Sequence, residues 1–106
     1  MSDTASAIYI DNTKGRAAFG EEGPKPQFLI NAPGFEALVV GLKAGQQIPV
    51  HPAELAMYHF LEGTGSMTVG DETFKIQPGV TVIAPDGMPR GMQAETQVIF
   101  LGAKVA

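Results

Sequence analysis

The side chains best suited to metal or acid–base chemistry are few in this chain. It has two histidines, His51 and His59, and no cysteine. The lack of cysteine excludes disulfides and thiolate metal sites, and no serine-hydrolase or phosphate-loop motif is present. The imidazole of His51 could ligate a metal or act as a general base. A lone histidine at the rim of a fold, with no ligand, is the alternative for this residue.

Arg90 is the second residue of chemical interest, because it follows a turn-rich segment, residues 85–89. A guanidinium stays charged and is costly to bury without a partner, so an inward-facing arginine favours a carboxylate or phosphate ligand. For an inward-facing Arg90, the hypothesis is that it binds a small anionic molecule together with His51. The alternative is that Arg90 reaches solvent or a surface acid such as Asp86 or Glu95.

The elements that must position these residues are predicted to be short strands. The chain has 13 glycines and 8 prolines among 106 residues, with 44% hydrophobic and 17% charged residues. This composition predicts an all-β antiparallel sandwich or barrel, and the length predicts one domain over residues 1–106. The predicted strands are residues 7–10, 28–30, 35–42, 47–50, 57–61, 66–69, 73–76, 80–84, 91–93 and 96–102.

Three local patterns qualify this assignment. Residues 21–27 contain two prolines and are predicted to form a loop. The segment Val69-Gly70-Asp71-Glu72 predicts a hairpin turn, since glycine adopts positive φ. Residues 52–60 have a helix-forming composition, but we favour a loop followed by a strand, because so short a helix is unstable alone.

Charge and hydropathy exclude several classes of function. The net charge of −4, with only seven Lys and Arg, argues against nucleic-acid binding. Apolar runs are too short to cross a bilayer, and the N-terminus lacks the apolar segment of a secretory signal. We therefore expect a cytoplasmic protein with no membrane or nucleic-acid partner.

The spacing of Gly79, Pro85, Gly87 and Arg90 resembles the second signature of the cupin superfamily, G-x5-P-x-G-x2-H-x3-N. The glycines and the proline match, whereas Arg90 stands in place of the histidine and Ala94 in place of the asparagine. The chain therefore resembles a small single-domain cupin of the cupin 2 conserved-barrel type. Such a cupin folds as a jelly-roll β-barrel, or double-stranded β-helix, here with its core over about residues 35–103.

The first cupin signature, G-x5-H-x-H-x(3,4)-E-x6-G, fits in two registers. Anchoring on Leu61-Glu62-Gly63 places Pro49 and His51 on the two histidines and Ala56 on the glutamate. The rival register starts at Gly45 and places His51 and Ala53 on the histidines and Tyr58 on the glutamate. In both registers one histidine is left of three and the glutamate is missing, so the resemblance implies a degenerate metal site.

The resemblance also implies where a ligand would bind. The ligand-binding candidates inside the barrel are His51, Tyr58, Phe60, Arg90 and Met92. We expect no cofactor. The alternative is a divalent transition metal with His51 as one of its ligands. His59 is expected to face outward, and Glu54 to be solvated unless it turns inward.

Three functions follow for such a protein. The first is binding of a small anionic or carbohydrate-like ligand without the usual metal. The second is an enzyme, either a metal-dependent dioxygenase or isomerase, or a metal-independent lyase or epimerase with His51 and Tyr58 as its acid–base pair. The third is a structural role. We also expect a homodimer, with residues 8–10 and 28–30 within the N-terminal region 1–34 as the strands that pair across it.

Overall fold

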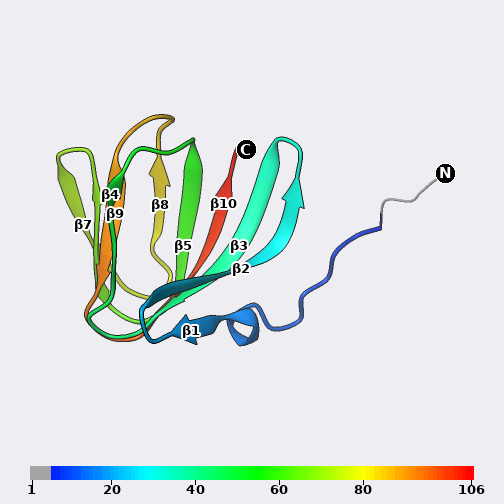
Figure 1. The fold of residues 1–106 in the computed structure, drawn as a ribbon, viewed down its shortest axis with the longest axis horizontal. Coiled ribbons are helices and arrows are strands. Elements are labelled where there is room, and N and C mark those ends of the chain that lie inside the picture. The colour runs from blue at the N-terminus through cyan, green and yellow to red at the C-terminus, as the bar shows by residue number, and fades with distance from the viewer. Residues whose placement is uncertain (1–5) are drawn as a thin grey trace.

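The computed structural model describes residues 6–106, and strands dominate this part of the chain. Two antiparallel sheets face each other and enclose the core (Figure 1). The described residues include one helical turn, the 3-10 turn η1 (Lys14–Arg16), and no helix among them is long and apolar enough to span a membrane. The predicted all-β antiparallel fold is confirmed.

The larger sheet has six strands in the order β1-β2-β3-β10-β5-β8. Every neighbouring pair within it is antiparallel. Its strands are β1 (Ala18–Gly20), β2 (Gly23–Ala32), β3 (Phe35–Leu42), β5 (Ala56–Glu62), β8 (Thr81–Ala84) and β10 (Val98–Lys104).

The smaller sheet has four antiparallel strands in the order β4-β9-β6-β7. Its strands are β4 (Gln47–His51), β6 (Gly65–Val69), β7 (Glu72–Ile76) and β9 (Arg90–Ala94). The chain passes repeatedly between the two sheets, so residues from distant parts of the sequence meet in the space between them (Figure 1).

The strands predicted from residue 28 onward are confirmed to within about two residues at most ends. The predicted hairpin is present: Val69 pairs with Glu72, and Gly70 adopts a φ of 59°. The segment that precedes β5 is a loop followed by a strand, as expected. The glycine and proline residues between the short apolar runs mark the ends of most of these strands correctly.

Two predictions for the N-terminal region are wrong. Residues 7–10 do not form a strand, because no strand among residues 6–106 lies beside them to supply hydrogen bonds. Residues 21–27 are not a loop throughout, since β2 begins at Gly23 and includes Pro24 and Pro26. The two prolines are two residues apart, so their missing N–H groups fall on the same edge of the strand and interrupt only one ladder.

The core lies between the inner faces of the two sheets. Phe100 is its aromatic centre, with its ring centroid 5.7 Å from those of both Tyr58 and Phe60. The buried cluster draws on both sheets and contains Val40, Leu42, Phe60, Met67, Val69, Ile76, Val82, Ala84, Met92, Ala94, Val98 and Phe100. Val40, Met92 and Phe100 of this cluster also line a cavity between the sheets.

Candidate functional site

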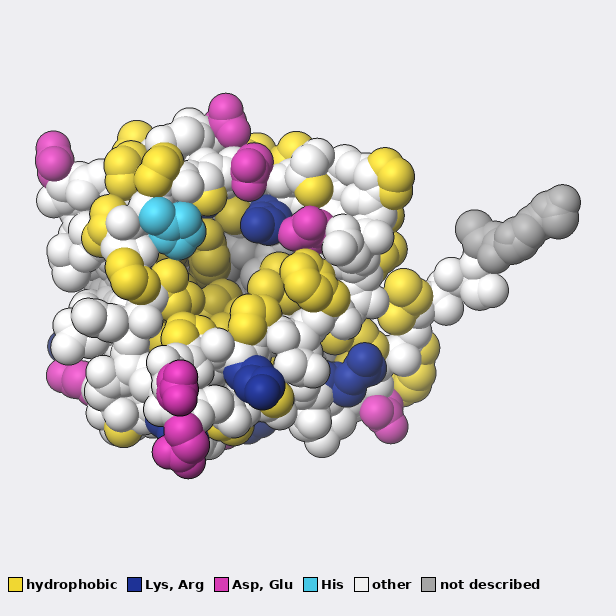
Figure 2. Space-filling model, in the orientation of Figure 1, with side chains coloured by type: hydrophobic (Ala, Val, Ile, Leu, Met, Phe, Trp, Pro, Cys, Tyr) yellow, Lys and Arg dark blue, Asp and Glu magenta, His cyan; other side chains and the backbone are white. Residues whose placement is uncertain are grey.

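A cavity of about 330 Å³ lies between the two sheets. Figure 2 shows the hollow, with hydrophobic side chains gathered around it and charged side chains at its rim. Its walls are mostly apolar, and its polar side chains are His51, Tyr58, Arg90 and Lys104. The other lining residues are Pro24, Pro26, Leu38, Val40, Ile48, Ala56, Gly91, Met92, Phe100, Gly102 and Ala103.

Arg90, the first residue of β9, is the only charged side chain that the described structure buries, with 1% of its surface exposed. Each of the five N–H groups of its guanidinium donates a hydrogen bond to an oxygen atom. These acceptors are the carbonyl oxygens of Met88 (2.9 Å from Nε), Glu54 (2.6 Å from Nη1), Ala53 (2.9 Å from Nη2) and Pro85 (2.8 Å from Nη2), and the hydroxyl oxygen of Tyr58 (3.3 Å from Nη1).

These bonds tie together the two loops at this end of the barrel. Ala53 and Glu54 belong to the loop between β4 and β5, whereas Pro85 and Met88 belong to the loop between β8 and β9. The amide of Gly87 also donates to the Ala53 carbonyl oxygen at 2.8 Å. One side chain therefore organises both loops.

The positive charge of Arg90 has no acidic partner among residues 6–106. No salt bridge to Arg90 is formed there, and no Asp or Glu lines the cavity. Carbonyl dipoles lower the cost of burying the cation but do not neutralise it. The cavity is therefore a region of positive potential with apolar walls.

His51 ends β4 and lies opposite Arg90 in the ladder between β4 and β9. The ladder shifts register between Ile48 and His51, because β4 carries one extra residue there. This bulge places Ile48 and His51 on the same side, and both line the cavity. Pro49, two residues before His51, does not line the cavity, and His51 itself is partly open to solvent at the rim.

Gly91 is the residue that makes room for this bulge. A Cβ added there would lie 2.7 Å from the carbonyl oxygen of Ile48 and 2.8 Å from the amide nitrogen of Val50. Such contacts with backbone atoms cannot be relieved by rotating a side chain. A residue without a side chain is therefore needed directly beside Arg90.

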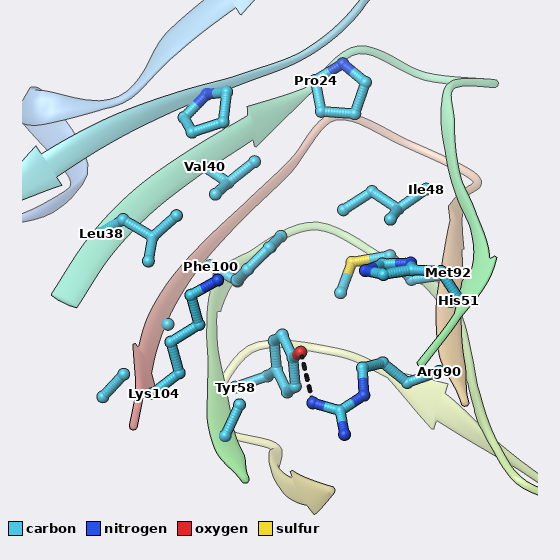
Figure 3. A pocket seen from close by; sticks show the side chains of 15 residues that line it. Pro24, Leu38, Val40, Ile48, His51, Tyr58, Arg90, Met92, Phe100 and Lys104 are labelled. Carbon is cyan, nitrogen blue, oxygen red and sulfur yellow. Dashed lines mark hydrogen bonds between the residues drawn. The ribbon is translucent and has the colours of Figure 1, made fainter. Parts of the chain in front are cut away.

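The hydrogen bonds of His51 and Tyr58 define which of their atoms can serve a ligand. The Nδ1 of His51 lies 2.8 Å from the Pro49 carbonyl oxygen, which can only accept, so Nδ1 carries a proton. In the neutral ring Nε2 is then an acceptor. The Tyr58 hydroxyl oxygen accepts from Arg90 (Figure 3), so its own proton is left to donate elsewhere.

Among the ligand-binding candidates, His51, Tyr58, Arg90 and Met92 line one cavity (Figure 3). Phe60 does not line it, because it lies deeper on β5 and is fully buried in the core. Sequence reasoning missed Lys104 at the end of β10, whose Nζ lies 3.6 Å from Glu36 Oε1. It also missed the two prolines of β2, since residues 21–27 were expected to form a loop.

His59 lies outside the cavity, as its position next to the inward-facing Tyr58 and Phe60 predicts. Its Nδ1 lies 2.7 Å from the Thr81 hydroxyl on the neighbouring strand β8. The carboxylate-bearing residue Glu54 is exposed and contributes only its carbonyl oxygen to the site. Neither side chain takes part in the cavity.

The family of the chain follows from a family comparison and from solved structures. The cupin domain model (Cupin_2) matches residues 38–101, which is more than half of the chain. The chain is a cupin. The prediction of a small cupin barrel is thereby confirmed, and a comparison with curated proteins found no match.

Solved structures with this cupin's fold include two bacterial proteins of similar length. One, from Thermus thermophilus, has a TM-score of 0.84 at 26% identity and covers 91% of this chain and 95% of its own. A conserved protein of unknown function from Streptococcus pyogenes has a TM-score of 0.82 at 22% identity, and the match covers 99% of this chain and 95% of that protein. Salicylate 1,2-dioxygenase from Pseudoaminobacter salicylatoxidans matches with a TM-score of 0.71 at 22% identity, over 77% of this cupin but 25% of the enzyme.

Many cupins hold a divalent metal, but the donor set of this cupin does not fit one. Residues 6–106 contain no group of three His, Cys, Asp or Glu side chains that could hold a metal ion. The cavity offers one imidazole and no carboxylate, and Arg90, directly opposite His51, is a fixed cation that would repel a metal. No chemistry through a metal is therefore derived for this site.

Proposed function

We propose that this cupin is a small-molecule-binding protein whose cavity takes a compact anion with an apolar body, without a metal. The observation that carries the proposal is a buried cation, Arg90, beside apolar walls that include no acid. An anion placed there gains from a charge that the protein itself leaves uncompensated. A cavity of about 330 Å³ has the size of a small organic ligand.

The chemistry of the walls favours an anion with an apolar body over a carbohydrate-like ligand. A sugar presents hydroxyl groups around its whole ring, and each of them loses a hydrogen bond to water when it is buried against apolar atoms. Leu38, Val40 and Phe100 offer such a ring no partner. An aliphatic or aromatic carboxylate needs polar partners at one end only.

The polar end of the ligand is proposed to lie near the Tyr58 hydroxyl. The Tyr58 hydroxyl can donate one hydrogen bond, because Arg90 already donates to its oxygen. Lys104 at the cavity wall adds a second positive charge, which it shares with the Glu36 carboxylate at 3.6 Å. Arg90 is a positioning residue in this arrangement, since all five of its N–H groups are used within the protein.

The test is a thermal-shift and calorimetric comparison of matched ligands. Benzoate and short branched carboxylates are expected to stabilise the protein, whereas benzamide, equal in shape but neutral, and sugar phosphates stabilise it less. Tyr58→Phe should weaken binding about tenfold, the loss of one hydrogen bond to a charged group. His59→Ala, a histidine outside the cavity, is the matched control and should leave binding unchanged.

Two results would count against the proposal. One is the absence of binding by every carboxylate, which would favour a structural role for the barrel. The other is equal binding of benzoate and benzamide, which would show that the charge of Arg90 has no part in recognition.

Proton transfer is a second candidate function, and the hydrogen bonds of His51 and Tyr58 favour it. An imidazole acceptor and a hydroxyl donor line one cavity, as a metal-independent isomerase, lyase or epimerase would need. The test is exchange of the C–H next to the carboxyl group of a bound ligand with D₂O, followed by NMR. Exchange that His51→Ala abolishes while binding persists would support catalysis; binding without exchange would leave this cupin a binding protein.

A further inference from the structure

Lys104 and Glu36 form an ion pair beside the cavity. The two residues lie directly opposite each other in the ladder between β10 and β3, and Nζ of Lys104 is 3.6 Å from Oε1 of Glu36. Lys104 lines the cavity, whereas Glu36 does not. The acid therefore acts on the cavity through the lysine that it holds.

The register of three neighbouring strands places Lys104 within reach of a ligand bound at Tyr58. Gly102 of β10 lies between Leu38 of β3 and Tyr58 of β5. Lys104 is two residues further along β10, so it shares the cavity face with Gly102 and is a diagonal neighbour of Tyr58 (Figure 3). Long side chains reach each other across such a diagonal. Gly102 itself has no side chain to fill the space between them.

The ion pair is weak enough for Lys104 to exchange its partner. Both side chains are partly open to solvent, with 37% of Lys104 and 18% of Glu36 exposed. An ion pair of this kind gains little from its attraction, because water screens it. A negatively charged group of a ligand would therefore compete with Glu36 for the ammonium group.

The charges at the cavity leave one positive charge uncompensated. Arg90 has no acidic partner among residues 6–106, whereas the charge of Lys104 is balanced by Glu36. A ligand with one negative charge compensates Arg90. A second negative charge on the ligand would have to share Lys104 with Glu36, and two carboxylates held close together repel each other.

We infer that Glu36 is a specificity-determining residue, which makes the cavity select monoanions over dianions of the same shape. The class of ligand is then a monocarboxylate with an apolar body. Glu36 excludes the competitor by repulsion and needs no contact with the preferred ligand. This inference rests on the proposed function, because it concerns the ligand of the same cavity.

The first test compares two ligands that differ by one charge. Isophthalate carries two carboxylates on a benzene ring, and its monoamide has the same shape with a single charge. Calorimetry at one pH and one ionic strength should show that wild type binds the monoamide about tenfold more tightly than isophthalate. This comparison uses wild type alone, so it does not depend on how a variant folds.

The second test removes the charge of Glu36 without changing the shape of its side chain. Glu36→Gln should shift the ratio of the two affinities about tenfold toward isophthalate, because Lys104 is then free for the second carboxylate. The double variant Glu36→Gln, Lys104→Met should return the ratio to that of wild type, because the cavity again has one uncompensated positive charge.

Glu62→Gln is the matched control. Glu62 forms an ion pair of the same 3.6 Å length with Lys14, but it lies at the end of β5, whereas Lys104 pairs with Ala56 at the start of that strand. This variant changes the net charge of the protein as Glu36→Gln does. It should leave the ratio of the two affinities unchanged.

The possible failures are distinguishable. Absence of binding by every carboxylate would overturn the proposed function and this inference with it. Binding of carboxylates with a ratio that Glu36→Gln does not change, or tighter binding of isophthalate than of its monoamide by wild type, would overturn the inference alone. An equal shift in Glu62→Gln would also overturn it, because net charge rather than Glu36 would then set the selection.

Discussion

Arg90 and Tyr58 join the two sheets of this cupin through one hydrogen bond, in which Nη1 of Arg90 donates to the Tyr58 hydroxyl oxygen at 3.3 Å. Arg90 begins β9 of the four-stranded sheet, and Tyr58 lies on β5 of the six-stranded sheet. The other four N–H groups of the same guanidinium bind loop carbonyl oxygens. A single side chain therefore connects both sheets and both loops at the cavity.

Arg90→Met should lower the free energy of unfolding by about 2 kcal/mol or more, because it removes five hydrogen bonds that a buried cation donates. Arg90→Lys should be intermediate, since an ammonium keeps the charge but cannot donate five bonds in one plane. Urea unfolding measures both. A methionine variant as stable as wild type would show that these hydrogen bonds contribute nothing net.

Two glycines of the cavity should respond oppositely to alanine. At Gly102 the nearest atom to an added Cβ would be 3.6 Å away, which is an ordinary contact. Gly102→Ala should therefore stabilise the protein by about 0.4–1 kcal/mol, because alanine lowers the conformational entropy of the unfolded chain. Gly91→Ala would place its Cβ 2.7 Å from backbone and should cost about 1–3 kcal/mol. Thermal unfolding of the two variants decides this, and equal stabilities would contradict the assigned role of Gly91.

Chelation should leave this cupin unchanged. EDTA is expected to alter neither the midpoint of thermal unfolding nor the binding of a carboxylate, because no carboxylate and only one imidazole line the cavity. Elemental analysis of protein purified without added metal is the direct measurement. One equivalent of a transition metal that is lost in His51→Ala would contradict the prediction.

Glu21 should titrate below its ordinary range. A hydrogen bond from Lys43, and then the charge of Lys43, lower the pKa of the Glu21 carboxyl. Since the folded-state pKa is depressed, the stabilisation is present above the unfolded-state pKa and is lost as pH falls through the folded-state pKa. NMR titration should show the Glu21 pKa rising to its usual value in Lys43→Met and in high salt; an unchanged pKa would show that Lys43 is not the cause.

The barrel could be predicted well from the sequence, and its N-terminal region could not. From β3 onward, turns marked by glycine and proline separate short β-prone runs and so reveal each strand. β2 escaped prediction because Pro24 and Pro26 indicate a loop, although prolines two residues apart remove hydrogen bonds from only one edge. Residues 7–10 have a strand-like composition, but composition alone does not show whether a neighbouring strand is present to form hydrogen bonds with them.

The cavity could be predicted only in part. Signature spacing led to His51 and Arg90, and alternation along β5 led to Tyr58. The use of all five Arg90 donors could not be anticipated, because it depends on four carbonyl oxygens from two loops that are distant in sequence. The bulge in β4 was also missed, since nothing in the residue pattern showed that Ile48 rather than Pro49 would share a side with His51.

The hydrogen bonds of Arg90 also bear on how the site comes into being. A barrel that must capture an ion exists in two forms, and its cavity is complete in only one of them. Here the organising cation is part of the polypeptide and cannot dissociate. For the two loops that Arg90 joins, folding and assembly of the cavity wall are consequently one event.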